Sequence, residues 1–229
     1  FFGRKKTTEL GDEYQLLITH LKNTAILSNE YASQFTTPEI GYLLGMLHDI
    51  GKYSDDFQKR IRDENIQTDH STAGAFVLKE LAIKEQNILY GILSYAIAGH
   101  HSGLLDYGSP AELGSCLYAR FEKCDPALFQ YWKNEVTDIP RISPKQLQII
   151  LEKDTVGFAL AQYVRFVFSC LVDADRTDAA NFSSGVETPN NITIDQLLDK
   201  YNCYIKKFQS DDFRRININD IRNSILNEC

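Results

Sequence analysis

The feature that most constrains this sequence is a helical segment that ends on a histidine and an aspartate. The stretch LLGMLHDIGKYSDDFQ, residues 43–58, has apolar residues at helical spacing and then places His48 next to Asp49. An unpaired polar group in a core costs several kcal/mol, about 2–7 for a neutral group and more for a charge. The fold must therefore supply partners for both. A metal ion is one candidate partner, because imidazole and carboxylate are standard ligands; a capped helix end or a His–Asp hydrogen bond is the alternative.

Helical periodicity extends over most of the 229 residues, and no alternating run or Asn-Gly hairpin signal stands out. We therefore predict an all-α fold. The expected helices cover 12–33, 38–51, 54–63, 70–84, 87–101, 110–121, 126–136, 143–152, 155–178, 193–209 and 217–228. A loop is expected at 177–193, where Ser, Asn, Gly and Pro are concentrated. The expected domains are residues 1–182 and a C-terminal helical extension at 183–229.

Composition and charge limit the class of protein. Apolar residues make up 43% of the chain and aromatic residues 11%, which is typical of a folded domain with a substantial core. No signal peptide and no run of about 18 uncharged apolar residues is found, so we expect a soluble, cytoplasmic protein. The five cysteines form no CxxC pair, which argues against a disulfide framework or a thiolate zinc site. The net charge of −7 provides no dominant basic field for nucleic acid.

All five histidines lie within or at the end of apolar helical segments. They are His20, His48, His70, His100 and His101. A single histidine on an apolar face is usually a hydrogen-bonded core residue, and for His20 alone this is the preferred interpretation. Five such placements, with one histidine beside an aspartate and two adjacent, favour a metal site.

A buried acid is expected on the predicted helix 155–178. An apolar stripe at spacings of three and four runs along it, through Val164, Val167, Phe168, Leu171 and Val172. Asp175 continues this stripe, and a carboxylate there needs a cation or strong donors. Asp175 is therefore the preferred ligand and Asp173 the fallback, with a helix-end acid as the alternative for Asp175.

These candidates form a nitrogen and oxygen ligand set without sulfur: His20, His48, Asp49, His70, His100, His101 and Asp175. The seven groups are too many for one tetrahedral ion, and they suit two adjacent divalent ions with Asp49 shared between them. Two such ions, about 3.5–4 Å apart, can activate water and stabilise the attacking and leaving oxygens of a phosphoryl displacement. Phosphoester hydrolysis is therefore the expected chemistry.

The order of these motifs resembles that of the HD-superfamily metal-dependent phosphohydrolases. The segments "HDIGKYSDDFQ", "DHSTAGA", "IAGHHSGL" and "LVDADRTD" together resemble the HD nuclease domain of the CRISPR-associated nuclease-helicase of type I systems, over residues 14–182. The tail "ININDIRNSILNEC" resembles the segment that leads into the helicase core of longer family members, while no GxxxxGK[ST] phosphate loop occurs in the sequence. We interpret the chain as an excised N-terminal domain, with a stand-alone nuclease subunit as the alternative.

The resemblance implies an HD-domain helical bundle with a metal site in the centre of the core. It implies one metal held by His20, His48, Asp49 and Asp175, and a second held by Asp49, His70, His100 and His101. Lys52 would face the substrate phosphate and neutralise developing charge, with an exposed helix-end lysine as the alternative. Ser102 and Gly103 would let the substrate backbone approach, although a helix C-cap explains Gly103 equally well.

The resulting expectation is an endonuclease that hydrolyses single-stranded DNA in CRISPR interference, with Asp49 and Lys52 catalytic. Its expected cofactors are two divalent ions, Mn, Ni, Fe, Co or Zn, with Mg as a further candidate. The expected partners are single-stranded DNA, a helicase domain in cis or as a subunit, and the type I surveillance complex, without a membrane. Two alternatives stay open: an HD phosphohydrolase acting on nucleotides or cyclic nucleotides, and a helical interaction module with structural histidines or a structural metal.

Overall fold

The computed structural model describes residues 1–62, 68–111, 116–145, 147–148, 156–185, 193–206 and 224. The chain divides into two compact units, Phe1–Glu187 and Thr188–Cys229, and each is considered by itself. The second unit is described mainly by α10 (Ile194–Lys206), which is exposed wherever its side chains are described.

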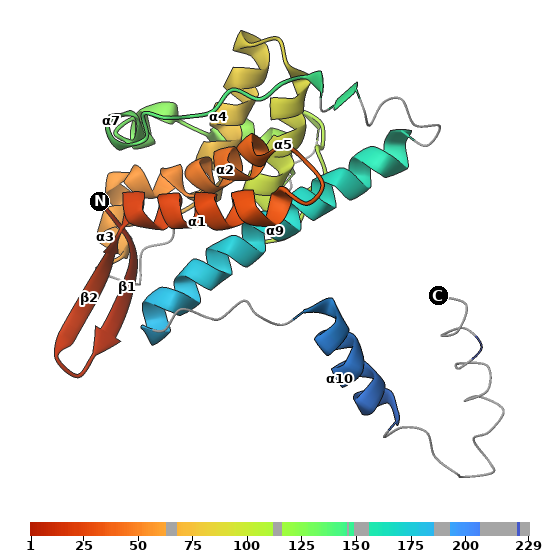
Figure 1. Ribbon diagram of the computed structural model, residues 1–229. Coiled ribbons are helices and arrows are strands. Elements are labelled where there is room, and N and C mark those ends of the chain that lie inside the picture. The colour runs from red at the N-terminus through yellow and green to blue at the C-terminus, as the bar shows by residue number, and fades with distance from the viewer. Residues whose placement is uncertain are drawn as a thin grey trace. The chain divides into compact units, whose positions relative to one another are not determined.

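Helices make up most of the regular structure in the first unit, which confirms the predicted all-α class (Figure 1). Helix α1 (Leu17–Ala32) packs on α2 (Pro38–Leu47), and α4 (Ser71–Lys84) packs on α5 (Ile88–Gly99). The long α9 (Val156–Ser184) packs against α1, α2 and α5. The shorter elements are η1 (Ile50–Tyr53), α3 (Asp55–Arg60), α6 (Leu117–Lys123), η2 (Pro126–Phe129) and α7 (Trp132–Glu135).

The hydrophobic core lies where α1, α2, α4 and α5 meet. Its largest fully buried side chains include Leu17 and Leu21 of α1, Leu44 and Leu47 of α2, and Leu93 of α5. Burial of side chains of this size stabilises the fold by about 1.5–3 kcal/mol each. Because α2 is buried from Leu43 to its end at Leu47, the residues that follow its last turn also lie inside the protein.

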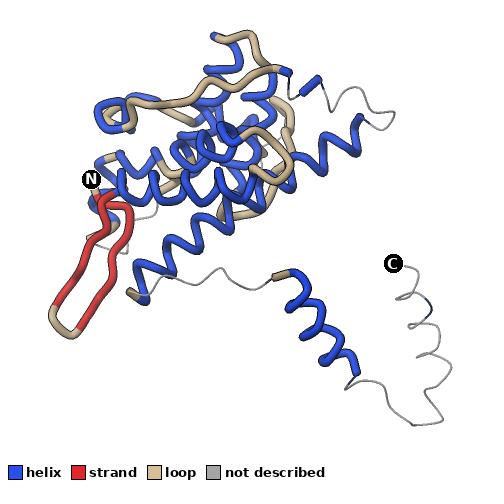
Figure 2. The backbone as a smooth tube through the Cα atoms, viewed as in Figure 1, coloured by secondary structure: helices blue, strands red, loops and turns tan. Residues whose placement is uncertain are grey.

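The N-terminus differs from the prediction, because it forms a β-hairpin (Figure 2). Strand β1 (Phe2–Thr8) pairs antiparallel with β2 (Gly11–Leu16), and α1 begins only at Leu17, so the expected helix 12–33 is wrong over its first residues. Most side chains of both strands are exposed or half-buried, so the segment carries no alternating apolar pattern that signals a strand.

Gln58 attaches this hairpin to the helical bundle. The Phe2 N–H donates to Gln58 Oε1 at 3.0 Å, and Gln58 Nε2 donates to the carbonyl oxygens of Phe2 at 3.0 Å and Lys52 at 2.7 Å. The hairpin is therefore fixed beside η1, close to the His48–Asp49 pair.

Several predicted boundaries also change. The expected helix 38–51 ends at Leu47, the expected helix 110–121 begins at Leu117, and 126–136 is divided between η2 and α7. The loop expected at 177–193 is wrong as far as residue 184, because α9 continues to Ser184 and passes the expected domain boundary at 182. The expected helices 143–152 and 217–228 lie largely outside the described residues.

Helix α9 is also the one helix in the described part of the chain that is long and apolar enough to cross a membrane. Its inward face packs on the bundle through Tyr163, Val167 and Leu171 and carries buried Asp175 and Asp178. Only a small part of its apolar stretch is buried, but one face of α9 packs on α1, α2 and α5, and we assign α9 to the bundle on these contacts.

Candidate metal centre

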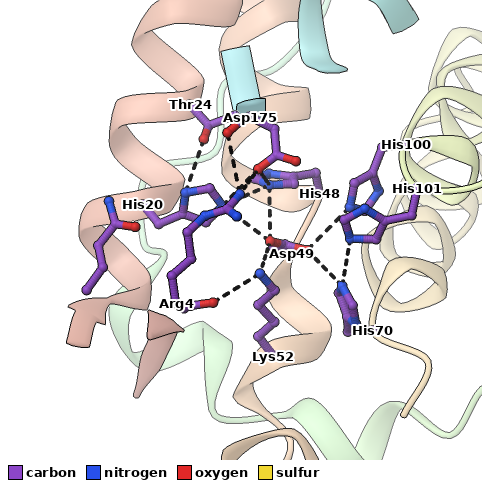
Figure 3. Close-up of polar contacts among 12 residues, drawn as sticks. Arg4, His20, Thr24, His48, Asp49, Lys52, His70, His100, His101 and Asp175 are labelled. Carbon is purple, nitrogen blue, oxygen red and sulfur yellow. Dashed lines mark hydrogen bonds and ion pairs between the residues drawn. The ribbon is translucent and has the colours of Figure 1, made fainter. Parts of the chain in front are cut away.

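The end of α2 places His48 and Asp49 in the core. The His48 N–H still donates to the Leu44 carbonyl at 2.9 Å, but the chain then leaves helical geometry at Asp49, with φ −116° and ψ 17°, and enters η1. Both residues are 0% exposed. The interruption directs the Asp49 carboxylate into the middle of a cluster of histidines (Figure 3).

One oxygen of Asp49 faces a first group of candidate ligands, made of His20, His48 and Asp175. Asp49 Oδ2 lies 3.2 Å from His20 Nε2 and 3.3 Å from His48 Nε2. Asp175 Oδ1 lies 3.3 Å from His20 Nε2 and 3.6 Å from His48 Nε2. Helices α1, α2 and α9 thus bring these side chains to one point from distant parts of the sequence.

The other oxygen of Asp49 faces a second group, made of His70, His100 and His101. Asp49 Oδ1 lies 3.4 Å from His100 Nε2 and 3.5 Å from His70 Nε2, and His70 Nε2 lies 2.8 Å from His101 Nε2. His70 precedes α4, whose first turn is capped by the Asp69 carboxylate, and the His100–His101 pair follows α5. Asp49 therefore joins the two groups through its two oxygens.

Backbone carbonyls fix the orientation of two of the imidazoles. His48 Nδ1 donates to the Gly45 carbonyl at 2.8 Å, and His100 Nδ1 donates to the Ile97 carbonyl at 2.7 Å. In both rings Nε2 is then left to face Asp49. Bonds of this kind to the second ring nitrogen are typical of metal-binding histidines.

His20 is oriented by a carboxylate that the sequence analysis missed, Asp178. His20 Nδ1 lies 2.6 Å from Asp178 Oδ2, which also accepts from Gln15 Nε2 at 2.8 Å, while Asp178 Oδ1 accepts from Asn23 Nδ2 at 2.7 Å. Asp178 is 3% exposed. Its sequence signal is that it continues the α9 stripe three residues beyond Asp175, but the predicted loop at 177–193 concealed it.

Two cations compensate the buried carboxylates. Lys52, 5% exposed, places Nζ 2.6 Å from Asp49 Oδ2 and 3.1 Å from the Gly3 carbonyl oxygen. Arg4 of β1 makes an ion pair with Asp175. The hairpin thus contributes a charged side chain to the site, which the sequence analysis did not anticipate. Lys52 is buried against Asp49 and is not an exposed helix-end lysine.

These charges shift the protonation of the site residues. Burial opposes ionisation, but Lys52 and His48 hold the pKa of Asp49 well below its ordinary range. Burial also opposes protonation of His48, yet Asp49 and Asp175 raise its pKa to about 9. In the second group, burial lowers the pKa of His70 to about 3 and that of His101 to about 4, so both are neutral at pH 7.

The two groups fit divalent metal ions. With Asp49 counted in both, each group offers four ligand atoms that all lie within 4.8 Å of one another. Asp49 Oδ1 and His100 Nε2 are buried without a hydrogen-bond partner, which is costly unless another species binds them. Ligands at about 2.0–2.2 Å from one ion are separated by roughly 3–3.5 Å, which matches the spacing around Asp49. The centre can therefore hold one ion in each group, with Asp49 as the shared ligand.

Three predicted positions are not among the clustered ligand residues. Asp173, the fallback ligand, is exposed, whereas Asp175 is 6% exposed and lies in the first group. Ser102 and Gly103 follow the end of α5: both N–H groups donate to the Gly99 carbonyl, at 2.9 and 2.7 Å, and Gly103 has a φ of +91°. Gly103 is thus accounted for as a helix cap.

A comparison with known protein families also points to a metal centre in this part of the chain. A buried His/Asp cluster in an all-α bundle defines a candidate metal-dependent hydrolase. Residues 17–127 match the family model of the HD domain, which supports assignment to the HD phosphohydrolase superfamily and indicates a metal-dependent phosphohydrolase. The matched segment contains every candidate ligand except Asp175. Among curated proteins, no match to the chain was found.

Proposed function

We propose that this protein is a nuclease that hydrolyses phosphodiester bonds of single-stranded DNA with the help of two divalent metal ions. The observation that carries the proposal is the position of Asp49, whose two oxygens face two separate ligand groups at 3.2–3.5 Å. Paired ions are the common arrangement for in-line displacement at phosphorus. The motifs of this chain occur in the same order as in the CRISPR-associated HD nucleases, and this resemblance supports single-stranded DNA as the proposed substrate.

The side chains at the site would have different roles in the reaction. When bound, divalent ions would supply Lewis acidity and activate the attacking water. Asp49 would be a ligand in both groups. Asp178 fixes the ring of His20 through Nδ1. The Lys52 ammonium, at the edge of the site, would neutralise the phosphate charge that develops during attack. None of these roles requires a protein nucleophile.

The proposed function includes two protein partners. We propose that a helicase domain, in cis or as a subunit, delivers the strand, and that a type I CRISPR surveillance complex recruits the assembly. The resemblance of "HDIGKYSDDFQ" and "IAGHHSGL" to that nuclease family supports both partners.

A phosphohydrolase acting on nucleotides or cyclic nucleotides is the second candidate. A pocket of about 620 Å³ lies beside the second ligand group, with Lys52, His70 and His101 in its wall. A volume of this order is typical of sites for small ligands. The same ligand set would serve either substrate, so the size of the substrate distinguishes the two activities.

The experiment compares substrates of different size. Protein stripped with chelator and reloaded with Mn²⁺, Ni²⁺, Mg²⁺ or Zn²⁺ would be offered a single-stranded oligonucleotide, 3′,5′-cyclic nucleotides and nucleoside monophosphates. The proposal predicts metal-dependent cutting of the oligonucleotide. Hydrolysis of the small substrates without action on the strand would replace the nuclease with the second candidate.

A further inference from the structure

The pocket beside the second ligand group has an unusual charge for an acidic protein. Its described lining contains four cationic residues, Arg4, Lys5, Lys52 and Arg60, and no acidic residue, in a chain whose net charge is −7. A larger pocket of about 880 Å³ on the same unit is lined by both acidic and basic residues. Cationic side chains are therefore concentrated in the wall next to the candidate metal centre.

Three of these cations already have carboxylate partners. Arg4 pairs with Asp175, Lys5 Nζ lies 2.9 Å from Asp12 Oδ2, and Lys52 pairs with Asp49. Arg60, on the last turn of α3, forms no ion pair with any residue that the structure describes. Its guanidinium lies 5.8 Å from the centre of the Phe57 ring, which limits its freedom of movement.

Aromatic side chains complete the pocket. The Phe57 ring is 5.1 Å from the His70 ring and 5.3 Å from Lys52 Nζ, and it is 7% exposed. Phe182, in the C-terminal part of α9, also lines the pocket and is only half-buried. A cationic wall with an accessible aromatic ring is the combination by which proteins bind single strands, through phosphates and stacked bases.

We propose that this pocket is the single-strand binding site that leads to the metal centre, with Arg60 binding a backbone phosphate and Phe182 stacking on a base. This proposal adds the residues that bind the strand, and it rests on the proposed function for the identity of the substrate. A duplex is disfavoured, because its bases are already stacked and leave no face for Phe182. The strand meets a wall whose described lining carries no acidic side chain, and Arg60 is the cation there that has no carboxylate partner among the described residues.

The test measures binding without catalysis. Fluorescence anisotropy would follow a labelled oligothymidylate of about twelve nucleotides, and an abasic strand of equal length, with chelator present and over a range of salt concentrations. The variants are Arg60→Gln and Phe182→Ala. The matched control is Lys59→Gln, which removes the same charge one residue away; Lys59 Nζ lies 3.2 Å from Asp56 Oδ1 and Lys59 lines the other pocket.

Each variant has its own expected result. Arg60→Gln should weaken binding of both strands about three- to tenfold and lower the salt slope by about 0.7, the value for one phosphate contact on a single strand. Phe182→Ala should weaken oligothymidylate binding about five- to tenfold and leave the abasic strand unaffected, because only the base is stacked. Lys59→Gln should bind like the wild type.

Other outcomes would overturn the pocket assignment. Equal effects of Arg60→Gln and Lys59→Gln, an equal effect of Phe182→Ala on both strands, or no binding by the wild type would each do so. The proposed function is judged separately, by cutting with metal present. If binding depends on Arg60 but no divalent ion supports cutting, the proposed nuclease activity is refuted and the pocket assignment is retained. If the protein cuts the strand but Arg60 contributes nothing to binding, the pocket assignment is refuted and the nuclease activity is retained.

Discussion

Asp178 Oδ2 lies 2.6 Å from Nδ1 of His20, deep between α1 and α9. The contact joins residues 158 positions apart and fixes the ring so that Nε2 faces Asp49 and Asp175. Against the effect of burial, hydrogen bonds to Asp175 and Asp178 raise the pKa of His20. A His–carboxylate contact of this kind orients a metal ligand and increases its basicity.

Replacing Asp178 by Asn should weaken metal binding about 10- to 100-fold, the usual effect of losing such a supporting partner. The carboxylate accepts from His20, Gln15 and Asn23, and an amide turns one of these acceptors into a donor. Isothermal titration with Mn²⁺ measures the change. Asp173→Asn is the matched control, because Asp173 is exposed on the same helix. Equal affinities of the two variants would show that Asp178 plays no part.

Metal affinity should rise with pH. Burial disfavours the imidazolium, but Asp49 and Asp175 hold the pKa of His48 at about 9 in the metal-free protein. Below pH 9 a proton therefore occupies Nε2 and competes with the metal. Because the proton on His48 is displaced, and His20 with its raised pKa adds to the effect, the Mn²⁺ dissociation constant should fall at least about tenfold per pH unit between pH 7 and 9. Titrations at several pH values test this, and a constant affinity over that range would contradict it.

Replacing Lys52 by Met should destabilise the metal-free protein by about 3 kcal/mol, because Asp49 would be left buried without its cation. Added Mn²⁺ should restore more stability in this variant than in the wild type, since the ion provides the missing charge. Urea unfolding with and without metal measures both effects. For comparison, Lys59→Met alters an exposed ion pair and should cost less than about 1 kcal/mol. Identical unfolding curves for the two variants would refute the role of Lys52.

The close contact of α1 and α2 should not tolerate a side chain at Gly45. A Cβ atom there would lie 2.3 Å from Ala25 Cα and 2.5 Å from the Ala25 backbone nitrogen. Gly45→Ala should therefore destabilise the protein by about 3 kcal/mol or more, because the helices must separate. In Gly157→Ala the new methyl group meets no atom within 4 Å, and a gain of about 0.5–1 kcal/mol is expected. Wild-type stability of Gly45→Ala by urea unfolding would contradict this packing.

The sequence was sufficient to predict the helical class and the core of the candidate site. The histidines gave strong signals because each interrupts an apolar pattern, and Asp175 continued a helical stripe that could be followed from Val164. Their role as ligands stays a prediction, while the structure shows that the side chains meet. Helix ends were less predictable: capping at Asp69 and the turn at Asp49 depend on local hydrogen bonds and tertiary packing.

Long-range contacts could not be predicted from the sequence. The hairpin has few buried side chains, and its position depends on Gln58, more than forty residues away. The contact between Arg4 and Asp175 therefore had no signal in the sequence. Asp178 was hidden by the polar composition after residue 177, although the surrounding residues are held in α9 by packing on α1. In both cases tertiary contacts outweigh local propensity.

The most direct test of the central claim is the degradation of circular single-stranded DNA by metal-stripped protein that is reloaded with Mn²⁺, beside the Asp49→Asn variant and the Asp173→Asn control. A circle has no ends, so its loss reports internal cutting. The account predicts that the wild type and Asp173→Asn cut the circle only with metal, and that Asp49→Asn binds less metal and cuts at least about a hundredfold more slowly. Cutting by Asp49→Asn at the wild-type rate, or an intact circle with folded and metal-loaded wild-type protein, would contradict it.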